Sequence, residues 1–440
     1  MTPSASTERI LPLIMTRSTP PANSATRVLL ASLIGTTIEF FDFYIYATAA
    51  VLVFPKLFFP SSDPTSATLH SLATFSVAFF ARPIGSAIFG HFGDRIGRKA
   101  TLVAALFTMG LSTVLIGALP TYSQIGVWAP ALLALCRFGQ GLGLGGEWGG
   151  AVLLATENAP HGKRAWYGMF PQLGAPLGFI LSSGVFLILT ALLSDAQFFS
   201  FGWRIPFLAS TVLVGVGLYV RLNLAETPVF QNALERNERV AVPMLEVFRS
   251  HGKHLLLGTM LSLTVFVTFY LMTVFALNWG TQSLGFSRGQ FLLMQMFSML
   301  FFALTIPISS LLADRYGRRI TQLWITVAIF VFGLVYAPLF GSGSTPVVML
   351  FLALGLGLMG LCYGPLGTLL SELFPTSVRY TGASLTFNLA GIFGASLAPY
   401  MAVWLSTHYG LNFVGYYLSA AALLSLLALW LTSETAHKHL

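Results

Sequence analysis

The 440-residue chain is 55% hydrophobic and only 9% charged, whereas an ordinary soluble domain carries about 25% charged residues. A soluble protein of this length could not cover its surface with so few charges, but a surface facing lipid needs none, so the composition excludes a soluble globular domain. The net charge of +8 comes from bases clustered between apolar segments, which is typical of membrane topology and argues against nucleic-acid binding.

Apolar runs long enough to cross a bilayer, which takes roughly 20 residues, recur along the whole chain. A polar tail at 1–26 precedes the first run, which is too long for the core of a signal peptide. Six runs come before a charged connector at 223–253, and six follow it. The runs are 27–53, 70–91, 101–120, 128–156, 165–193, 201–222, 254–279, 290–313, 321–341, 346–374, 380–405 and 412–432.

This pattern predicts an all-α membrane protein with twelve transmembrane helices. We expect a six-helix bundle at 27–222, a cytoplasmic connector at 223–253, a second six-helix bundle at 254–433 and a cytoplasmic tail at 434–440. Lysine and arginine distribution supports this division, because cytoplasmic loops are enriched in these residues. With both termini cytoplasmic, eighteen bases fall in cytoplasmic segments and three fall outside.

Two short motifs occur once in each half. GHFGDRIGRK at 90–99 reappears as SLLADRYGRR at 310–319, and ENAPHGKR at 157–164 reappears as ELFPTSVR at 372–379, with Glu, Pro and Arg in register. All four copies lie in basic segments, so an even number of spans separates the copies of each motif. The sequence therefore predicts two similar bundles related by an axis along the membrane normal, with the substrate bound between them near the midplane.

Five ionisable residues fall inside predicted spans, where a charge is costly and by default indicates function. They are Glu39, Asp42, Arg82, Arg137 and Glu147, all in the first half. Glu39 and Asp42 are three residues apart and share one helix face. Glu39 is roughly 18 Å into its span at 1.5 Å per residue, which predicts a position near the midplane.

We expect Asp42 to carry a proton and Arg137 to be its partner. In a low-dielectric interior a carboxylate beside an arginine stays ionised, and it protonates when moved away. A static buried salt bridge that only joins two helices is the alternative. Glu39 could be the proton site instead, because the sequence does not rank the burial of the two acids.

The remaining polar residues of the spans are candidates for substrate binding. Arg82 could clamp a carboxylate, since its forked guanidinium matches one, or its Arg-Pro context could serve a helix kink. On span four, Gly141, Gly145 and Gly149 fall four apart and predict a ridge that lets a neighbouring helix approach closely. The full set of substrate-binding candidates is Arg82, Gln140, Glu147, Tyr46, Gln172, Tyr270, Tyr363 and Asn388.

The motifs resemble those of the major facilitator superfamily, whose best-known signature matches DRIGR at 94–98 and its second copy. Further motifs resemble the metabolite:proton symporter family, and among its members the shikimate-type carriers and inner-membrane metabolite transport proteins are most similar. These motifs are EFFDF at 39–43, ARP at 81–83, RFGQGLGLGGEWGG at 137–150, WRIPF at 203–207 and ETP at 226–228. Sugar/proton symporters of the superfamily have an acid and an arginine at the places of Asp42 and Arg137.

The resemblance implies proton-coupled uptake of a small, usually carboxylated metabolite at a bacterial inner membrane. The loop motifs are expected to form charged networks that close the cytoplasmic side, although the same charges could merely set topology. The residues of these expected gates are Gly90, Asp94, Arg95, Gly97, Arg98, Glu157, Arg164, Glu226, Asp314, Arg315, Gly317, Arg318, Glu372 and Arg379.

We therefore expect a monomeric symporter in the lipid bilayer, with a small-molecule substrate and the proton as coupling ion. The alternatives are a proton-coupled exporter or antiporter, an uncoupled facilitator, and a carrier of a zwitterionic osmolyte. An enzyme is not expected, because the sequence has no nucleophile–base arrangement and no phosphate loop. No metal site or cofactor is expected either, since the eight histidines are scattered.

Overall fold

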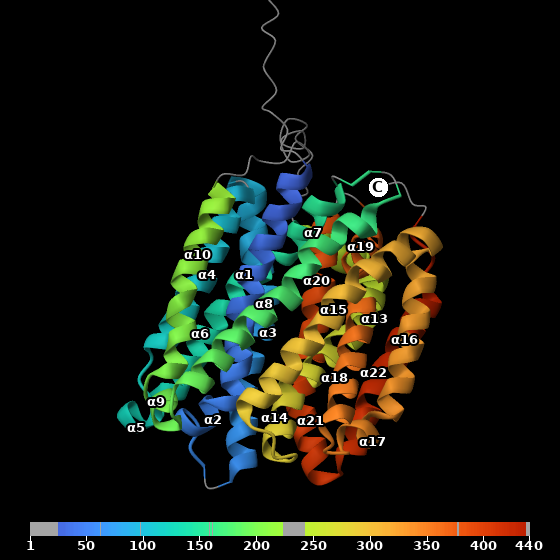
Figure 1. Ribbon diagram of the computed structural model, residues 1–440. Helices are drawn as coiled ribbons and strands as arrows, with labels where there is room; N and C mark the ends of the chain where they lie inside the picture. The colour runs from blue at the N-terminus through green and yellow to red at the C-terminus, as the bar shows by residue number, and fades with distance from the viewer. Residues whose placement is uncertain are drawn as a thin grey trace, which may run out of the picture.

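Two bundles of helices lie side by side, each built from one half of the chain (Figure 1). The computed structural model describes residues 25–61, 63–96, 98–157, 159–160, 162–222, 243–375 and 378–436. Every regular element within these ranges is helical. A helix satisfies its own backbone hydrogen bonds, which a chain surrounded by hydrocarbon must do.

The first bundle contains six membrane-length passages joined by short helices. Its spans are α1, α3, α4, α8, α10 and a passage made of α6 followed by α7. The bounds are α1 Ala25–Leu52, α2 Phe54–Leu57, α3 Pro64–Ile96, α4 Arg98–Ala118, α5 Tyr122–Ile125, α6 Trp128–Gly145, α7 Trp148–Glu157, α8 Arg164–Leu192, α9 Asp195–Ser200, a 3₁₀ turn Gly202–Arg204 and α10 Ile205–Leu222.

The second bundle repeats this plan after a short helix, α12. Three of its spans are single helices, α15, α16 and α22. The other three are pairs of helices in one passage: α13 and α14, α18 and α19, and α20 and α21. The bounds are α12 Pro243–Ser250, α13 Gly252–Tyr270, a π-helical segment Leu271–Phe275, α14 Ala276–Gln282, α15 Arg288–Tyr316, α16 Arg318–Leu334, α17 Tyr336–Phe340, α18 Thr345–Tyr363, α19 Leu366–Glu372, α20 Arg379–Ala390, a π-helical segment Gly391–Ser396, α21 Leu397–His408 and α22 Leu411–Leu431.

The predicted fold class is confirmed. Nine helical stretches among the described residues are long and apolar enough to cross a membrane. The other three passages are α4, α6 with α7, and α16, which are shorter, interrupted or carry a charge. The outer faces of the spans suit lipid: on α4, Phe107, Leu111 and Leu115 recur every four residues and are all exposed.

Glycines on span four allow α6 to lie directly against α3, as the sequence predicts. A Cβ on Gly141 would come within 2.7 Å of the Ala78 Cα, and one on Gly145 would collide with the Arg82 carbonyl. The ridge is shorter than expected, however, because α6 ends at Gly145 and the chain turns before α7. Gly149 therefore faces Ser384 of the other bundle instead of α3.

The two bundles meet along two seams. Helix α8 packs along α15 on one side, and α3 packs along α20 and α21 on the other. Across the second seam, the Ser76 hydroxyl donates to the Ser396 carbonyl over 2.7 Å. These seams leave the inner faces of α1, α7, α13 and α18 to enclose the space between the bundles.

The close approach of α3 and α6 predicts that Gly141→Ala destabilises the protein, because the added methyl has only backbone to displace. Overpacking of this kind costs about 1–3 kcal/mol. We expect a lower melting temperature in detergent and a smaller monodisperse fraction. Gly215→Ala on α10 is the matched control, since a Cβ there would meet nothing within 4 Å. Equal stability of the two variants would contradict this account of the packing.

Candidate functional site

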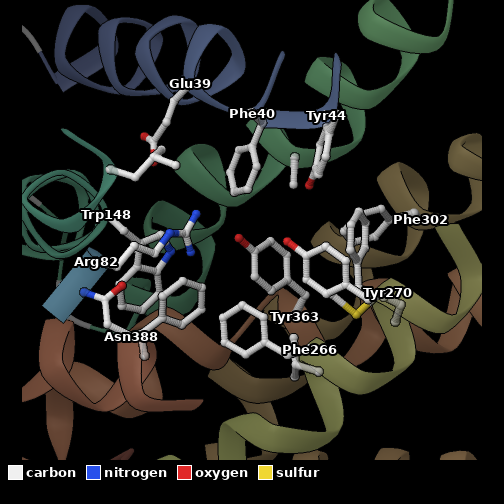
Figure 2. Close-up of a pocket in the computed structure, with 16 residues that line it drawn as sticks. Glu39, Phe40, Tyr44, Arg82, Trp148, Phe266, Tyr270, Phe302, Tyr363 and Asn388 are labelled. Carbon is white, nitrogen blue, oxygen red and sulfur yellow. The ribbon is translucent and has the colours of Figure 1, made fainter. Parts of the chain in front are cut away.

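The candidate site is a cavity between the two bundles (Figure 2). Its volume is about 30 Å³, room for about two water molecules on the same measure. Both halves contribute to its walls, so relative motion of the bundles must change its size. Its lining residues are Glu39, Phe40, Tyr44, Arg82, Leu144, Trp148, Ala175, Val265, Phe266, Phe269, Tyr270, Phe302, Met359, Tyr363, Phe387 and Asn388.

Arg82 of α3 is the cation of this cavity. It is buried, and its guanidinium lies over the rings of Phe43 and Phe79, with Cζ 4.9 and 5.1 Å from their centroids. The Arg82 Nε has no hydrogen-bond partner. Helix α3 continues through Pro83 without a break. The structure thus places Arg82 in the cavity wall with one donor unpartnered.

Two further predicted residues lie near Arg82 in the cavity wall. Glu39 of α1 lines the cavity and is buried. Asn388 of α20 donates through Nδ2 to the Ser86 hydroxyl over 2.8 Å. In Figure 2, Arg82 and Asn388 lie together on one side of the cavity. An acid, a base and an amide from three spans therefore line one small space.

Tyrosines line the other side of the cavity. Tyr270 of α13 and Tyr363 of α18 were predicted, and Tyr44 of α1 joins them (Figure 2). Tyr270 directly precedes the π-helical segment of span seven, and Tyr363 is the last residue of α18. Interruptions in the helical hydrogen-bond pattern thus lie beside the cavity, as is frequent at functional sites.

An aromatic stack that the sequence analysis missed borders the cavity. Trp148 of α7 and Phe387 of α20 lie parallel, with ring centroids 3.8 Å apart and an interplanar angle of 4°. Gln172 holds this arrangement: its Oε1 accepts from the Trp148 indole over 3.2 Å, and its Nε2 donates to the Tyr363 carbonyl over 3.1 Å. A large aromatic side chain among the glycines of 141–150 was the available signal.

Asp42 lies outside the cavity lining and is completely buried. Its Oδ1 accepts from the Ser210 hydroxyl of α10 over 2.5 Å, whereas its Oδ2 has no hydrogen-bond partner. The Thr113 side chain of α4 lies beside the same carboxyl group. Asp42 is therefore held within the first bundle by side chains from two neighbouring spans.

Arg137 is also completely buried, but in this conformation it is not paired with Asp42 by any ion pair among the described residues. The expectation of a direct pair is not met here. Arg137 donates through Nε to the Phe75 carbonyl over 3.2 Å and through Nη1 to Gln140 over 2.9 Å. Gln140 in turn donates to Thr113 over 2.8 Å. A chain of polar side chains thus connects Arg137 with the surroundings of Asp42.

Three of the predicted substrate-binding residues on spans one and four lie behind the cavity wall. Tyr46 packs its ring against the Arg137 guanidinium, with Cζ 4.1 Å from the ring centroid. Gln140 belongs to the polar chain around Arg137, and Glu147, although buried, does not line the cavity. Gln172 likewise acts through Trp148. None of these four residues lines the cavity.

The second-half loop motifs form a network of charges, which we call the inner charge network: Arg164, Asp314, Arg318 and Glu372. Arg318 lies 3.2 Å from Asp314 (Nη2 to Oδ1) and 3.4 Å from Glu372 (Nε to Oε2). Glu372 Oε1 lies 3.7 Å from Nη1 of Arg164. Arg164 belongs to the first half, so the network joins the two bundles.

Asp314 makes a second connection between the halves at the first turn of α8. Its carboxylate accepts from the backbone N–H groups of Ala165 and Trp166 over 3.1 and 3.0 Å. A carboxylate at this position satisfies otherwise unpaired N–H groups and interacts favourably with the helix dipole. The segment after α22 also takes part, since the Thr435 hydroxyl donates to Glu372 over 2.7 Å. Sequence analysis had no signal for Thr435.

The other predicted gate residues lie around this network or outside the described part of the chain. Gly317 has a φ of +105°, which glycine adopts without strain. Arg379 is buried and donates to the carbonyls of Ser371 and Phe374, whereas Arg315 is exposed. Gly97 and Glu226 lie outside the described residues, as do the surroundings of Gly90 and the side chains of Asp94, Arg95, Arg98 and Glu157.

Two six-helix bundles that enclose a cavity between them, with charged contacts joining them at one end, define a membrane transport protein. The comparisons give its family. A family model described as "Sugar (and other) transporter" matches residues 28–246, and one described as "Major Facilitator Superfamily" matches residues 261–440. The chain belongs to the major facilitator superfamily. It is a multi-pass transporter of the inner-membrane type and not an enzyme.

Similar proteins agree with this assignment and with the resemblance to metabolite:proton symporters. The chain is 59% identical over 425 residues to the inner membrane metabolite transport protein YhjE of Escherichia coli, covering 96% of this chain and 97% of that one. It is 37% identical to the shikimate transporter of Escherichia coli, covering 96% and 98%, and 33% identical to the proline/betaine transporter of the same organism, covering 94% and 84%.

Solved structures share the fold at low sequence identity. A partially occluded inward-open structure of the xylose transporter XylE from Escherichia coli has a TM-score of 0.72 and 19% identity, and covers 94% of this chain and 99% of that one. A crystal structure of a D-xylose–proton symporter has the same TM-score with 20% identity, covering 94% and 98%. These similarities establish the fold.

The inner charge network predicts that Asp314→Asn opens this end of the molecule. The variant loses the ion pair to Arg318 and a charged acceptor for two N–H groups, and bonds to charged groups contribute about 1.5–3 kcal/mol each. A shift of about 1.4 kcal/mol corresponds to a tenfold change in population. We expect about tenfold faster maleimide labelling of a single cysteine at buried position Ser384, with Cys136 and Cys362 replaced by alanine.

Arg315→Gln is the control for this measurement, because Arg315 neighbours the network in sequence but its side chain is exposed. Labelling that is equally fast in the two variants, or unchanged in Asp314→Asn, would show that the network does not hold this end closed.

Proposed function

We propose that this protein is a proton-coupled symporter that takes up a small carboxylated metabolite by alternating access. Arg82 carries the proposal: it is a buried guanidinium with an unpartnered nitrogen in the wall of a cavity that both bundles line. Arginine presents its donors in a fork that fits a carboxylate, and a desolvated arginine without such a partner is costly. A substrate carboxylate would supply the missing acceptor.

The aromatic walls of the cavity support a substrate with an apolar or ring-shaped body. Trp148, Phe266 and Phe387 offer flat faces, and Tyr270 and Tyr363 add hydroxyl groups. Pockets for small metabolites combine such walls with a few well-placed polar groups. At about 30 Å³ the cavity is too small for a metabolite, so binding requires the bundles to move apart. That requirement is what alternating access supplies.

Asp42 is the proposed proton carrier, with the proton as the coupling ion. A carboxyl group changes its protonation when its surroundings change, and Asp42 has one oxygen without a partner. Arg137 also has an unpartnered nitrogen, Nη2. A rearrangement of the polar side chains between them would bring a cation toward the acid in one state and away from it in another. Glu39, in the cavity wall, is the alternative carrier.

The decisive experiment is uptake into proteoliposomes with an imposed pH gradient. Aromatic and aliphatic carboxylates, shikimate and betaine are offered in turn. Accumulation of a carboxylate that depends on external acidity supports the proposal. Transport that does not respond to the gradient supports an uncoupled facilitator, and gradient-driven efflux supports an antiporter. Preference for betaine over all simple carboxylates would support a carrier of zwitterions.

Asp42→Asn is expected to abolish accumulation driven by the pH gradient while leaving exchange of substrate partly intact. The amide preserves the shape of the side chain and its contact with Ser210 but cannot release a proton. The measurement compares uptake against a concentration gradient with counterflow exchange. Glu39→Gln serves as the parallel variant: accumulation that survives Asp42→Asn but fails in Glu39→Gln would transfer the role to Glu39.

Arg82→Gln is expected to raise the KM for the transported carboxylate by about 10- to 100-fold, because charge-assisted hydrogen bonds contribute about 1.5–3 kcal/mol each. Arg82→Lys retains the charge but loses the fork, so we expect an intermediate KM. The measurement is initial uptake over a range of concentrations, with the neutral amide of the same compound as competitor. If the amide competes as well as the acid in the unchanged protein, Arg82 does not bind a carboxylate.

A further inference from the structure

A second cavity lies at the end of the molecule opposite the inner charge network, and the proposed function does not use it. We call it the outer vestibule. It lies between the α1–α3 region of the first bundle, where Lys56 and Ser61 line it, and the α14–α15 region of the second, where Thr281 and Arg288 line it. Helices α2, α9 and α14 mark this end at the bottom of Figure 1.

The outer vestibule is large enough for a metabolite in the present conformation, whereas the central cavity is not. Its volume is about 690 Å³, against about 30 Å³ for the central cavity. Small-molecule sites typically measure about 300–1,000 Å³. A substrate arriving from this side would therefore first occupy the outer vestibule, before the central cavity opens to receive it.

Two cationic side chains of the vestibule wall converge on one aromatic ring. The Lys56 Nζ lies 4.7 Å from the centroid of the Phe199 ring, and the Arg288 Cζ lies 5.2 Å from the same centroid. The two charges thus lie within about 10 Å of each other, although one belongs to each bundle. Positive charges repel at this distance, so an anion in the vestibule that contacts Lys56 and the exposed part of Arg288 would be bound favourably.

The carboxylates at this end of the molecule do not line the vestibule. Asp195 pairs with Arg288 from the side of α9. Asp63 accepts hydrogen bonds from the backbone and hydroxyl of Ser66 at the start of α3, and these bonds lower the pKa of its carboxyl group. Lys56 has no ion pair among the residues that the structure describes. Lys56 is therefore the cation of the lining without an ion pair in the described part of the chain, whereas Arg288 shares its charge with Asp195.

We propose that the outer vestibule is a second binding site, a capture site at which Lys56 and Arg288 hold the carboxylate of the incoming substrate. The choice of a carboxylate rests on the proposed function, whereas the preference for an anion rests on the vestibule alone. The Ser61 hydroxyl in the same wall accepts from the Asp63 backbone N–H and has its own hydrogen free to donate to a bound carboxylate. The site raises the local concentration of substrate at the entrance to the central cavity, as cationic clefts do for anions.

The test is protection of a single cysteine in the vestibule. Ser61→Cys is made in protein whose Cys136 and Cys362 are alanine, and it is labelled with the uncharged reagent N-ethylmaleimide. Benzoate, succinate and shikimate serve as anionic probes, and benzamide is the neutral counterpart of benzoate. We expect at least one anion to slow labelling and benzamide to leave it unchanged. The protection should persist in Arg82→Gln, in which the central site is impaired.

Charge variants then identify the groups that bind the anion. Lys56→Gln is expected to lower the apparent affinity for the protecting anion by about threefold at low salt. Lys56→Glu is expected to lower it by about tenfold, because this substitution doubles the change in charge. Both effects should vanish near 1 M salt, where the screening length is about 3 Å. Lys253→Gln is the matched control, since it removes the same charge from an exposed position on α13, outside the vestibule.

Three results would overturn the capture site. They are the absence of protection by all three anions, equal protection by benzamide, and loss of protection in Arg82→Gln. Failure of proton coupling in proteoliposomes leaves these measurements unaffected, so the capture site and the proposed symport are tested independently.

Discussion

Charge cannot be left in contact with hydrocarbon, and this constraint explains where the ionisable side chains of this protein lie. Asp42 and Arg137 are completely buried, and each is held by polar groups from neighbouring spans instead of facing lipid. Arg82 is shielded in a different way, by the aromatic rings of Phe43 and Phe79, in the wall of a small cavity. Because such burial is costly unless the charge is compensated, these residues are the ones on which the proposed transport mechanism is built.

The contacts between the bundles differ in chemistry from one end of the molecule to the other. At one end, ion pairs and a charged helix cap join them through Arg164, Asp314 and Glu372. In the middle, the stacked rings of Trp148 and Phe387 join them. At the other end, the vestibule opens between them, and contacts such as the pair of Arg288 with Asp195 of α9 join them beside it. In the proposed alternating access, the charged and aromatic contacts break when the bundles rock, whereas the vestibule end is already open.

The residues of the site can be predicted from the sequence better than the contacts between them. Five candidates line the cavity, because a polar residue in an apolar span avoids lipid and faces the interior of the protein. They are Glu39, Arg82, Tyr270, Tyr363 and Asn388. Asp42 and Arg137 were expected to pair directly, and here they are linked only through Gln140 and Thr113. A helix face can be predicted from spacing, but the distance between side chains on different helices depends on how those helices pack and on the conformation of the carrier.

The sequence by itself determined the membrane class, the twelve spans and the internal repeat, because these follow from hydropathy and local pattern, which need no knowledge of tertiary contacts. Only the tertiary structure decided which residues meet: that Trp148 stacks on Phe387, that Asp314 caps α8 of the other half, and that Lys56 and Arg288 approach one ring. Each of these contacts joins segments far apart in the chain or in different bundles. Their geometry depends on helix crossing and on the relative position of the two halves, which no periodicity encodes.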